Sequence, residues 1–131
     1  MVTISQAANK TGLSVKSIRH YEEIKLIDTP PRDESGYRFY PDSLLKQLHF
    51  IVNAKQAGFN LQECKILLAL SENEHRSSKN VKEIALQKIE EIEARIKQQQ
   101  LLVQQLKKIT KQCPGDQQSE CAIIDAFSVD Q

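Results

Sequence analysis

Two cysteines near the end of the chain are the side chains best suited to chemistry. Cys113 and Cys121 enclose the seven residues PGDQQSE. Pro followed by Gly is a strong turn signal, so the chain can fold back and bring the two sulfurs together. Two thiolates without an intervening histidine form a soft site with few donors, which suits a thiophilic monovalent ion better than Mg²⁺ or Ca²⁺. Spacing alone leaves a metal site, a disulfide and an incidental pair all open.

A long helix must position this loop. From Ser77 or Ser78 to about Thr110 the sequence contains no Gly and no Pro, so we predict a helix over residues 77–111 that is about 50 Å long. Residues spaced alternately by four and three form a heptad seam, apolar except at Gln99 and Thr110: Ala85, Ile89, Ile92, Ile96, Gln99, Val103, Leu106 and Thr110. Such a seam predicts a two-stranded coiled coil with a second copy of the chain. The alternative is packing against the chain's own N-terminal domain.

The N-terminal part, residues 1–71, is predicted to form a small helical domain. Gly12 and Ser14 separate two short helices, which predicts a helix-turn-helix at about residues 5–24. Turn residues and an alternating segment predict a wing at about residues 32–40. Asn60 caps a further helix whose predicted apolar face is Leu61, Ile66, Leu67, Leu68 and Leu70. We expect Cys64, which lies within this helix, to be a small core residue.

Composition narrows the function classes. The 131 residues carry a net charge of +1, but residues 113–131 hold four acidic residues and no basic ones. There is no apolar run of membrane-spanning length and no signal-peptide pattern, so we expect a cytoplasmic protein without a membrane partner. The sequence lacks the common catalytic motifs, and its three histidines are scattered, so we do not expect an enzyme. In a reducing cytosol, paired cysteines favour ligands or free thiols over a structural disulfide.

Several motifs, in order along the chain, resemble the MerR family of transcriptional regulators. These are SQAA from residue 5, TGLS from residue 11, IRHYEE from residue 18, SGYRFY from residue 35 and AGFNLQE from residue 57. The tail, CPGD from residue 113 and CAII from residue 121, is similar to the copper-efflux regulator branch (CueR type). Two positions depart from the family pattern: Lys25 stands where Gly is common, and His20 replaces a more usual aromatic residue.

The resemblance implies a mainly α fold. A winged helix-turn-helix is followed by a long antiparallel dimerisation helix, and residues 112–131 form a metal-binding loop with a short terminal helix. It also implies a homodimer on a pseudo-palindromic operator in double-stranded promoter DNA, where effector binding changes the DNA distortion so that RNA polymerase can use the promoter. The family's metal ligands correspond to Cys113 and Cys121. The position that is cysteine in divalent-metal branches corresponds to Ser78.

The donor set agrees with a monovalent ion. Two thiolates around a +1 ion leave a net charge of −1, which a helix start such as that at Ser78 can stabilise. A +2 ion prefers a third or fourth N or S donor. We therefore predict an activator of copper-homeostasis genes that senses Cu(I), with Ag(I) or Au(I) as mimics. The alternatives are a thiol redox sensor, a regulator for another metal, or a copper-buffering coiled-coil protein.

The expected DNA contacts lie on the second helix of the helix-turn-helix and on the wing. Base contacts set sequence preference, whereas phosphate contacts set the register on the duplex. The candidates are Ser14, Val15, Lys16, Arg19, His20, Tyr21, Tyr37 and Arg38. Tyr21 is equally suited to packing beneath the helix.

Overall fold

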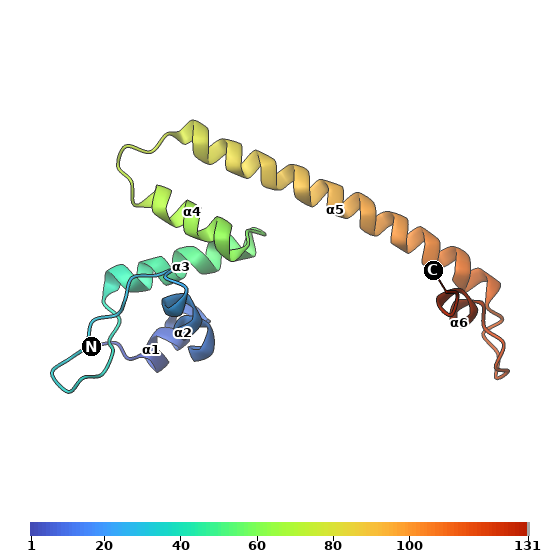
Figure 1. Ribbon diagram of the computed structural model, residues 1–131, viewed down its shortest axis with the longest axis horizontal. Coiled ribbons are helices and arrows are strands. Elements are labelled where there is room, and N and C mark those ends of the chain that lie inside the picture. The colour runs from blue at the N-terminus through green and yellow to red at the C-terminus, as the bar shows by residue number, and fades with distance from the viewer. Residues whose placement is uncertain (131) are drawn as a thin grey trace. The chain divides into compact units, whose positions relative to one another are not determined.

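The computed structural model describes residues 1–130, and the elements it describes are helices joined by turns (Figure 1). The chain forms two compact units, Met1–Lys88 and the residues from Ile89 onward. The first unit holds four helices and the start of a fifth, and the second holds the rest of that helix and a short terminal one. The mainly α fold with a helix-turn-helix and a long helix is the one predicted.

The helix-turn-helix is made by α1 (Ile4–Thr11) and α2 (Val15–Glu23). Thr3 Oγ1 accepts the N–H of Gln6 and Gln6 Oε1 accepts the N–H of Thr3, which is a capping box. Ser14 Oγ accepts the N–H of Ser17 at 3.0 Å and so begins α2. The caps at Thr3 and Ser14 set the start of both helices locally, before any tertiary contact is made.

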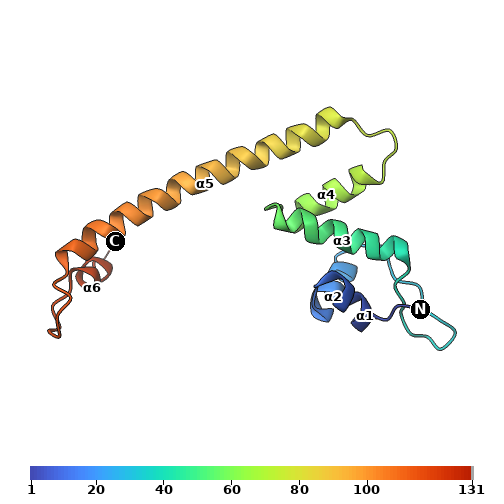
Figure 2. The same cartoon turned by 180° about the vertical axis from the view of Figure 1, so that it is seen from behind.

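The core of the first unit lies between this motif and two further helices, α3 (Asp42–Gln56) and α4 (Leu61–Ser71). In both ribbon views, α1 and α2 lie on one side of α3 and α4 lies on the other (Figures 1 and 2). Ile18, Tyr40, Leu48, Ile51 and Cys64 are its largest fully buried side chains. The buried position of Cys64 agrees with its expected role in the core. Ile66 does not: it is 47% exposed, and Cys64 and Leu68 are the buried residues of α4.

The wing is a turn rather than a pair of strands. A single antiparallel bridge joins Arg32 and Arg38, and the N–H of Gly36 donates to Asp33 O at 3.0 Å. Asp33 Oδ1 accepts the N–H groups of Ser35 and Tyr37. The alternating segment that helped to predict the wing ends at a buried residue, Tyr40, whose N–H donates to Val2 O.

The fifth helix, α5 (Ser78–Gln112), contains 35 residues, and α6 (Ala122–Phe127) follows it after a loop. Seam residues of α5 in the second unit are largely uncovered in the single chain: Ile89 is 48% exposed, Ile96 52% and Val103 48%. Ile96 and Val103 line an open groove together with Arg95, Gln99 and Lys107. Among the described residues, no helix is long and apolar enough to cross a membrane.

Two helices of the first unit end in the left-handed backbone region. After α1 the left-handed residue is Gly12, with φ 78°, and after α2 it is Lys25, with φ 59°. Lys25 therefore adopts a backbone conformation that glycine adopts with the least strain. The N–H of Leu26 still donates to Tyr21 O at 2.9 Å, so hydrogen bonds and the buried Leu26 and Ile27 hold the turn in place.

Exchanging the residue types at these two positions should change stability in opposite directions. Lys25→Gly removes a left-handed strain of about 1 kcal/mol, partly offset by the greater entropy of the unfolded chain, so the free energy of unfolding should rise by up to about 1 kcal/mol. Gly12→Ala should lower it by about 1 kcal/mol, because no atom lies within 4 Å of the added Cβ and only the backbone strain counts.

Chemical denaturation measures both changes, and Lys25→Ala is the control because it keeps the Cβ. A rise in stability for Lys25→Ala as large as that for Lys25→Gly would show that the side chain, and not the backbone strain, is responsible.

Candidate DNA-binding surface and thiol site

The exposed face of α2 carries the predicted basic contacts. Lys16, Arg19 and His20 are all exposed, and Ser14, exposed at the cap, leaves the first N–H groups of α2 at the surface. Backbone N–H groups at a helix start bind phosphate oxygens, and side chains in the first turns reach base edges. The arrangement is therefore suited to DNA contact.

Two of the predicted contact residues face inward. Tyr21 is 3% exposed and lies in the core, and Val15 is half-buried and packs against that core. Burial of this kind makes them supports for α2, as the packing alternative for Tyr21 anticipated. Of the predicted contacts on α2, Lys16, Arg19 and His20 are thus the ones that form its exposed surface.

The wing brings further arginines next to α2. Arg38 Nε lies 3.0 Å from Glu22 Oε1, and Arg19, Arg32, Tyr37 and Arg38 line one groove. Tyr37 is 73% exposed at its rim. Arg32 Nη1 donates to Gly36 O at 2.7 Å, which holds the tip of the wing. The Glu22–Arg38 pair was not predicted, because the two residues are 16 positions apart and only the folded chain brings them together.

A buried tyrosine lies near these charges. Tyr40 is fully buried, and its hydroxyl has no hydrogen-bond partner among the described residues. Burial raises the pKa of Tyr40 and Glu22 raises it further, while Arg38 and Arg19 act in the opposite direction. Glu22, Arg38 and Arg19 therefore all lie close enough to Tyr40 to influence its ionisation.

The two cysteines of the loop meet in the structure. Cys113 Sγ and Cys121 Sγ lie 3.3 Å apart, and both are free thiols of intermediate exposure. This distance is well beyond the roughly 2.05 Å of a disulfide bond. Cys113 follows α5 and its N–H donates to Thr110 O, whereas Cys121 is the residue before α6. The end of one helix and the start of the next therefore present the two sulfurs to each other.

The surroundings favour the thiolate form of Cys121. The pKa of Cys121 is lowered, chiefly by the backbone N–H of Ile124 and then by the thiol of Cys113, while Asp125 opposes the shift. The thiolate is the form that binds metals and attacks electrophiles. These two sulfurs fit a soft, thiophilic ion, and among residues 1–130 no group of three or more His, Cys, Asp or Glu side chains is placed to hold a metal.

Ser78 and Cys64 lie in the first unit, apart from the pair of loop cysteines in the second unit. Ser78 is the first residue of α5 and is exposed, and its place near a bound ion stays a prediction. Cys64 is fully buried, and burial raises the pKa of its thiol. Cys64 is therefore poorly suited to bind an ion, and Cys113 and Cys121 stay the predicted ligands.

Comparison with known proteins places this arrangement in a family. Residues 2–71 match the model described as MerR HTH family regulatory protein, and residues 45–109 match the model described as MerR, DNA binding. The chain is 43% identical over 127 residues to the HTH-type transcriptional regulator CueR of Salmonella typhimurium, covering 97% of this chain and 92% of that protein. The likeness to the copper-efflux branch inferred from the tail is confirmed by this relative.

Two solved structures share the fold. The transcription regulator PbrR691 from Ralstonia metallidurans CH34, in complex with lead(II), has a TM-score of 0.83 at 25% identity and covers 98% of this chain and 100% of its own. MerR from Bacillus megaterium MB1, in complex with mercury(II), has a TM-score of 0.70 at 29% identity, covering 93% of this chain and 95% of its own. With its helix-turn-helix, wing and long helix, the chain belongs to the MerR family of helix-turn-helix transcriptional regulators.

Proposed function

We propose that this regulator is a homodimeric activator of copper-homeostasis genes that senses Cu(I) through Cys113 and Cys121. The observation that carries the proposal is the pair of free thiols 3.3 Å apart, in a loop at the end of the long helix of a MerR-family chain. Two thiolates and a +1 ion leave a net charge of only −1. A +2 ion prefers further N or S donors. Ag(I) and Au(I) are expected to act as mimics.

Promoter DNA is the proposed partner of the first unit. The exposed Lys16, Arg19 and His20 supply contacts from α2, and Tyr37 and Arg38 supply contacts from the wing. A two-fold dimer predicts a pseudo-palindromic operator. Binding of the ion changes transcription by RNA polymerase only if the ion-bound dimer favours a different state of the promoter, because a ligand shifts an equilibrium by its differential affinity for the two states. The proposed compartment is the cytoplasm, where promoter DNA is available.

The seam of α5 is the proposed dimer interface. Its apolar residues are about half exposed in the single chain, and a continuous apolar stripe of this length needs a partner helix. The acidic residues of α5 (83, 90, 91 and 93) all lie in its first half, where basic residues at 79, 82, 88 and 95 balance them, and the second half carries only basic residues at 97, 107, 108 and 111. This asymmetry favours antiparallel pairing, because a parallel pair would place the two basic halves side by side.

A redox switch is the second candidate, because the same short distance between the sulfurs allows oxidation to a disulfide. Closing from 3.3 Å to about 2.05 Å needs only a small movement of the loop. Activation of transcription by an oxidant without any metal would favour this candidate. Activation by Cu(I) under reducing, anaerobic conditions would favour copper sensing.

Anaerobic titration against competing chelators tests the copper proposal. The reduced protein should bind one Cu(I) per chain tightly and should not match that affinity for Zn²⁺. Cys113→Ser and Cys121→Ser should each lose the tight site, because one thiolate cannot replace the pair. Cys64→Ala is the matched control, since it removes a cysteine that is buried outside the loop. Tight Zn²⁺ binding, or Cu(I) binding that survives both loop substitutions, contradicts the proposal.

A carboxylate in the seam should disrupt the dimer. Ile96→Asp would bury two charges in an apolar interface, which is strongly unfavourable, so the variant should sediment as a monomer at micromolar concentration. Leu101→Asp is the control, because Leu101 is 52% exposed and lies between the seam positions 99 and 103, on the other face of α5. A monomeric wild-type protein, or a dimeric Ile96→Asp variant, would rule out this interface.

Arg19 should contribute directly to operator binding. Arg19→Ala should weaken binding to a selected operator about tenfold to a hundredfold, measured by fluorescence anisotropy at fixed salt. A contact to guanine would also relax the preference at one base pair, whereas a contact to phosphate would reduce the salt dependence by about one unit of slope. Lys65→Ala, an exposed lysine of α4, should bind as the wild type does. An unchanged affinity for Arg19→Ala removes this residue from the interface.

A further inference from the structure

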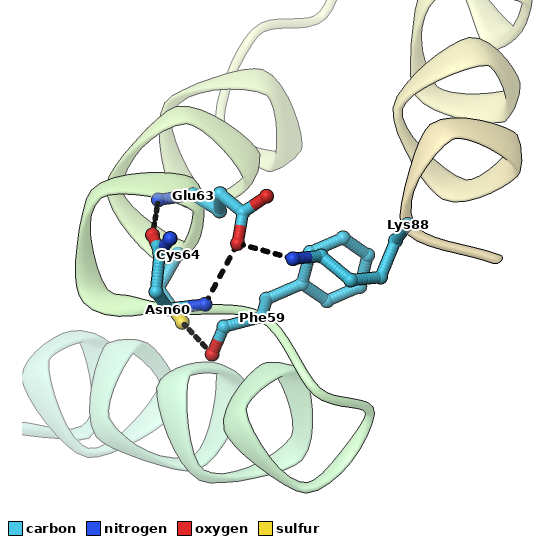
Figure 3. Close-up of polar contacts among 5 residues, drawn as sticks. All are labelled: Phe59, Asn60, Glu63, Cys64 and Lys88. Carbon is cyan, nitrogen blue, oxygen red and sulfur yellow. Dashed lines mark hydrogen bonds and ion pairs between the residues drawn. The ribbon is translucent and has the colours of Figure 1, made fainter. Parts of the chain in front are cut away.

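Lys88 is a buried charged residue in the part of α5 that belongs to the first unit. It is 5% exposed, although it lies on a helix that is mostly exposed beyond it. Its Nζ lies 2.8 Å from Glu63 Oε1 on α4 and 5.6 Å from the centroid of the Phe59 ring (Figure 3). A carboxylate and an aromatic face both stabilise the ammonium group.

The partner carboxylate also begins α4. Glu63 Oε1 accepts the N–H of Asn60 at 2.9 Å, and Asn60 Oδ1 accepts the N–H of Glu63 at 2.9 Å (Figure 3). One oxygen atom therefore binds both the capping box of α4 and Lys88. Phe59 lies in the same turn, and its N–H donates to Ala54 O at the end of α3. Lys88 thus contacts the corner between α3 and α4.

The choice of a lysine here calls for a reason other than stability. Val81 and Ile84, seven and four residues earlier on the same face of α5, are half-buried apolar residues, and an apolar residue at position 88 would continue that face. Desolvation offsets much of the attraction in a buried ion pair, so such a pair adds little net stability over an apolar replacement. Its distinctive property is direction, because the ammonium must meet one carboxylate, and fixing a register is the best-attested use of such groups.

We propose that Lys88 is a positioning residue: its ion pair with Glu63, beside Phe59, fixes the orientation in which α5 starts from the corner between α3 and α4. In a dimer this contact occurs twice, once in each copy. The two contacts limit how far the recognition helices, which are the α2 helices of the two copies, can move relative to each other. The inference rests on the dimeric, DNA-binding part of the proposed function and is independent of which effector binds the thiols.

A fixed orientation of α5 on the corner between α3 and α4 has a measurable consequence for the spacing of DNA half-sites that the dimer accepts. Changing the distance between two half-sites by one base pair displaces one of them by about 3.4 Å and rotates it by about 35°. A dimer with fixed recognition helices discriminates against that change, and a dimer with loosened attachments tolerates it. The ion pair therefore controls discrimination between operator spacings more than affinity for the preferred operator.

The test compares the wild type with the double variant Lys88→Met/Glu63→Gln. Met keeps an unbranched apolar side chain, and Gln can still accept the N–H of Asn60, as Gln6 does for Thr3 in α1. Lys82→Met is the matched control, because Lys82 is an exposed lysine on the same helix. Glu63→Gln alone serves if the double variant does not fold by circular dichroism.

Two measurements on the full chain decide the inference. Hydrogen–deuterium exchange of residues 78–88 should be about threefold faster in the double variant, with α1 to α3 unchanged, because the pair holds α5 in one orientation but adds little net stability. Affinity for the preferred operator should change less than threefold, while the penalty for one added or removed base pair should fall from at least tenfold to less than threefold. Lys82→Met should behave as the wild type does.

Unchanged exchange over residues 78–88 would overturn the inference, whether or not the protein proves to be a dimer or a copper sensor. Faster exchange with an unchanged spacing penalty would also overturn it, because the ion pair would then have only a structural role. A wild-type protein that does not respond to Cu(I) would instead contradict the proposed effector, and both measurements would remain valid.

Discussion

The structure depends on a helix whose apolar seam one chain leaves uncovered. The first turns of α5 contribute Val81, Ile84 and Lys88 to the first unit, but from Ile89 onward the apolar side chains are largely exposed. The hydrophobic effect scales with the apolar area removed from water, so covering this stripe in a dimer would be favourable. Pairing through the seam would join two DNA-binding units in one molecule, and it would make the readout of two half-sites possible.

The DNA-binding surface is held together by contacts that are not themselves contacts to DNA. The wing is closed by hydrogen bonds to Asp33 rather than by a pair of strands, and the Arg38–Glu22 pair joins it to α2. Glu22 also compensates part of the positive charge that Arg19 and Arg38 place on this surface. Tyr40, at the end of the wing, is fully buried in the core. Hydrogen bonds within the wing and this buried residue thus fix the loop that presents Tyr37 and Arg38.

The loop between Cys113 and Cys121 and the base of α5 both rely on a small number of polar groups in directional contacts. At the loop, two sulfurs and the backbone N–H of Ile124 favour a thiolate. At the base of α5, one carboxylate oxygen binds both Lys88 and the start of α4. Because α5 is a continuous helix from Ser78 to Gln112, a change in either contact acts on the same element. Under the proposed function, that continuity would let an ion bound at the two thiols act on the DNA-binding unit.

The sequence by itself determined the features that depend on neighbouring residues. Caps at Ser14 and Asn60, the end of α1 at Gly12 and the heptad spacing of α5 follow from local hydrogen bonding and side-chain periodicity. The turn at Pro114 and Gly115 likewise indicated that the two cysteines meet. Only the tertiary structure decided which side of each helix faces the core, so Tyr21 is interior and Ile66 is exposed. The pairs Glu22–Arg38 and Glu63–Lys88 also needed the fold, because they join residues 16 and 25 positions apart, beyond the reach of any local pattern.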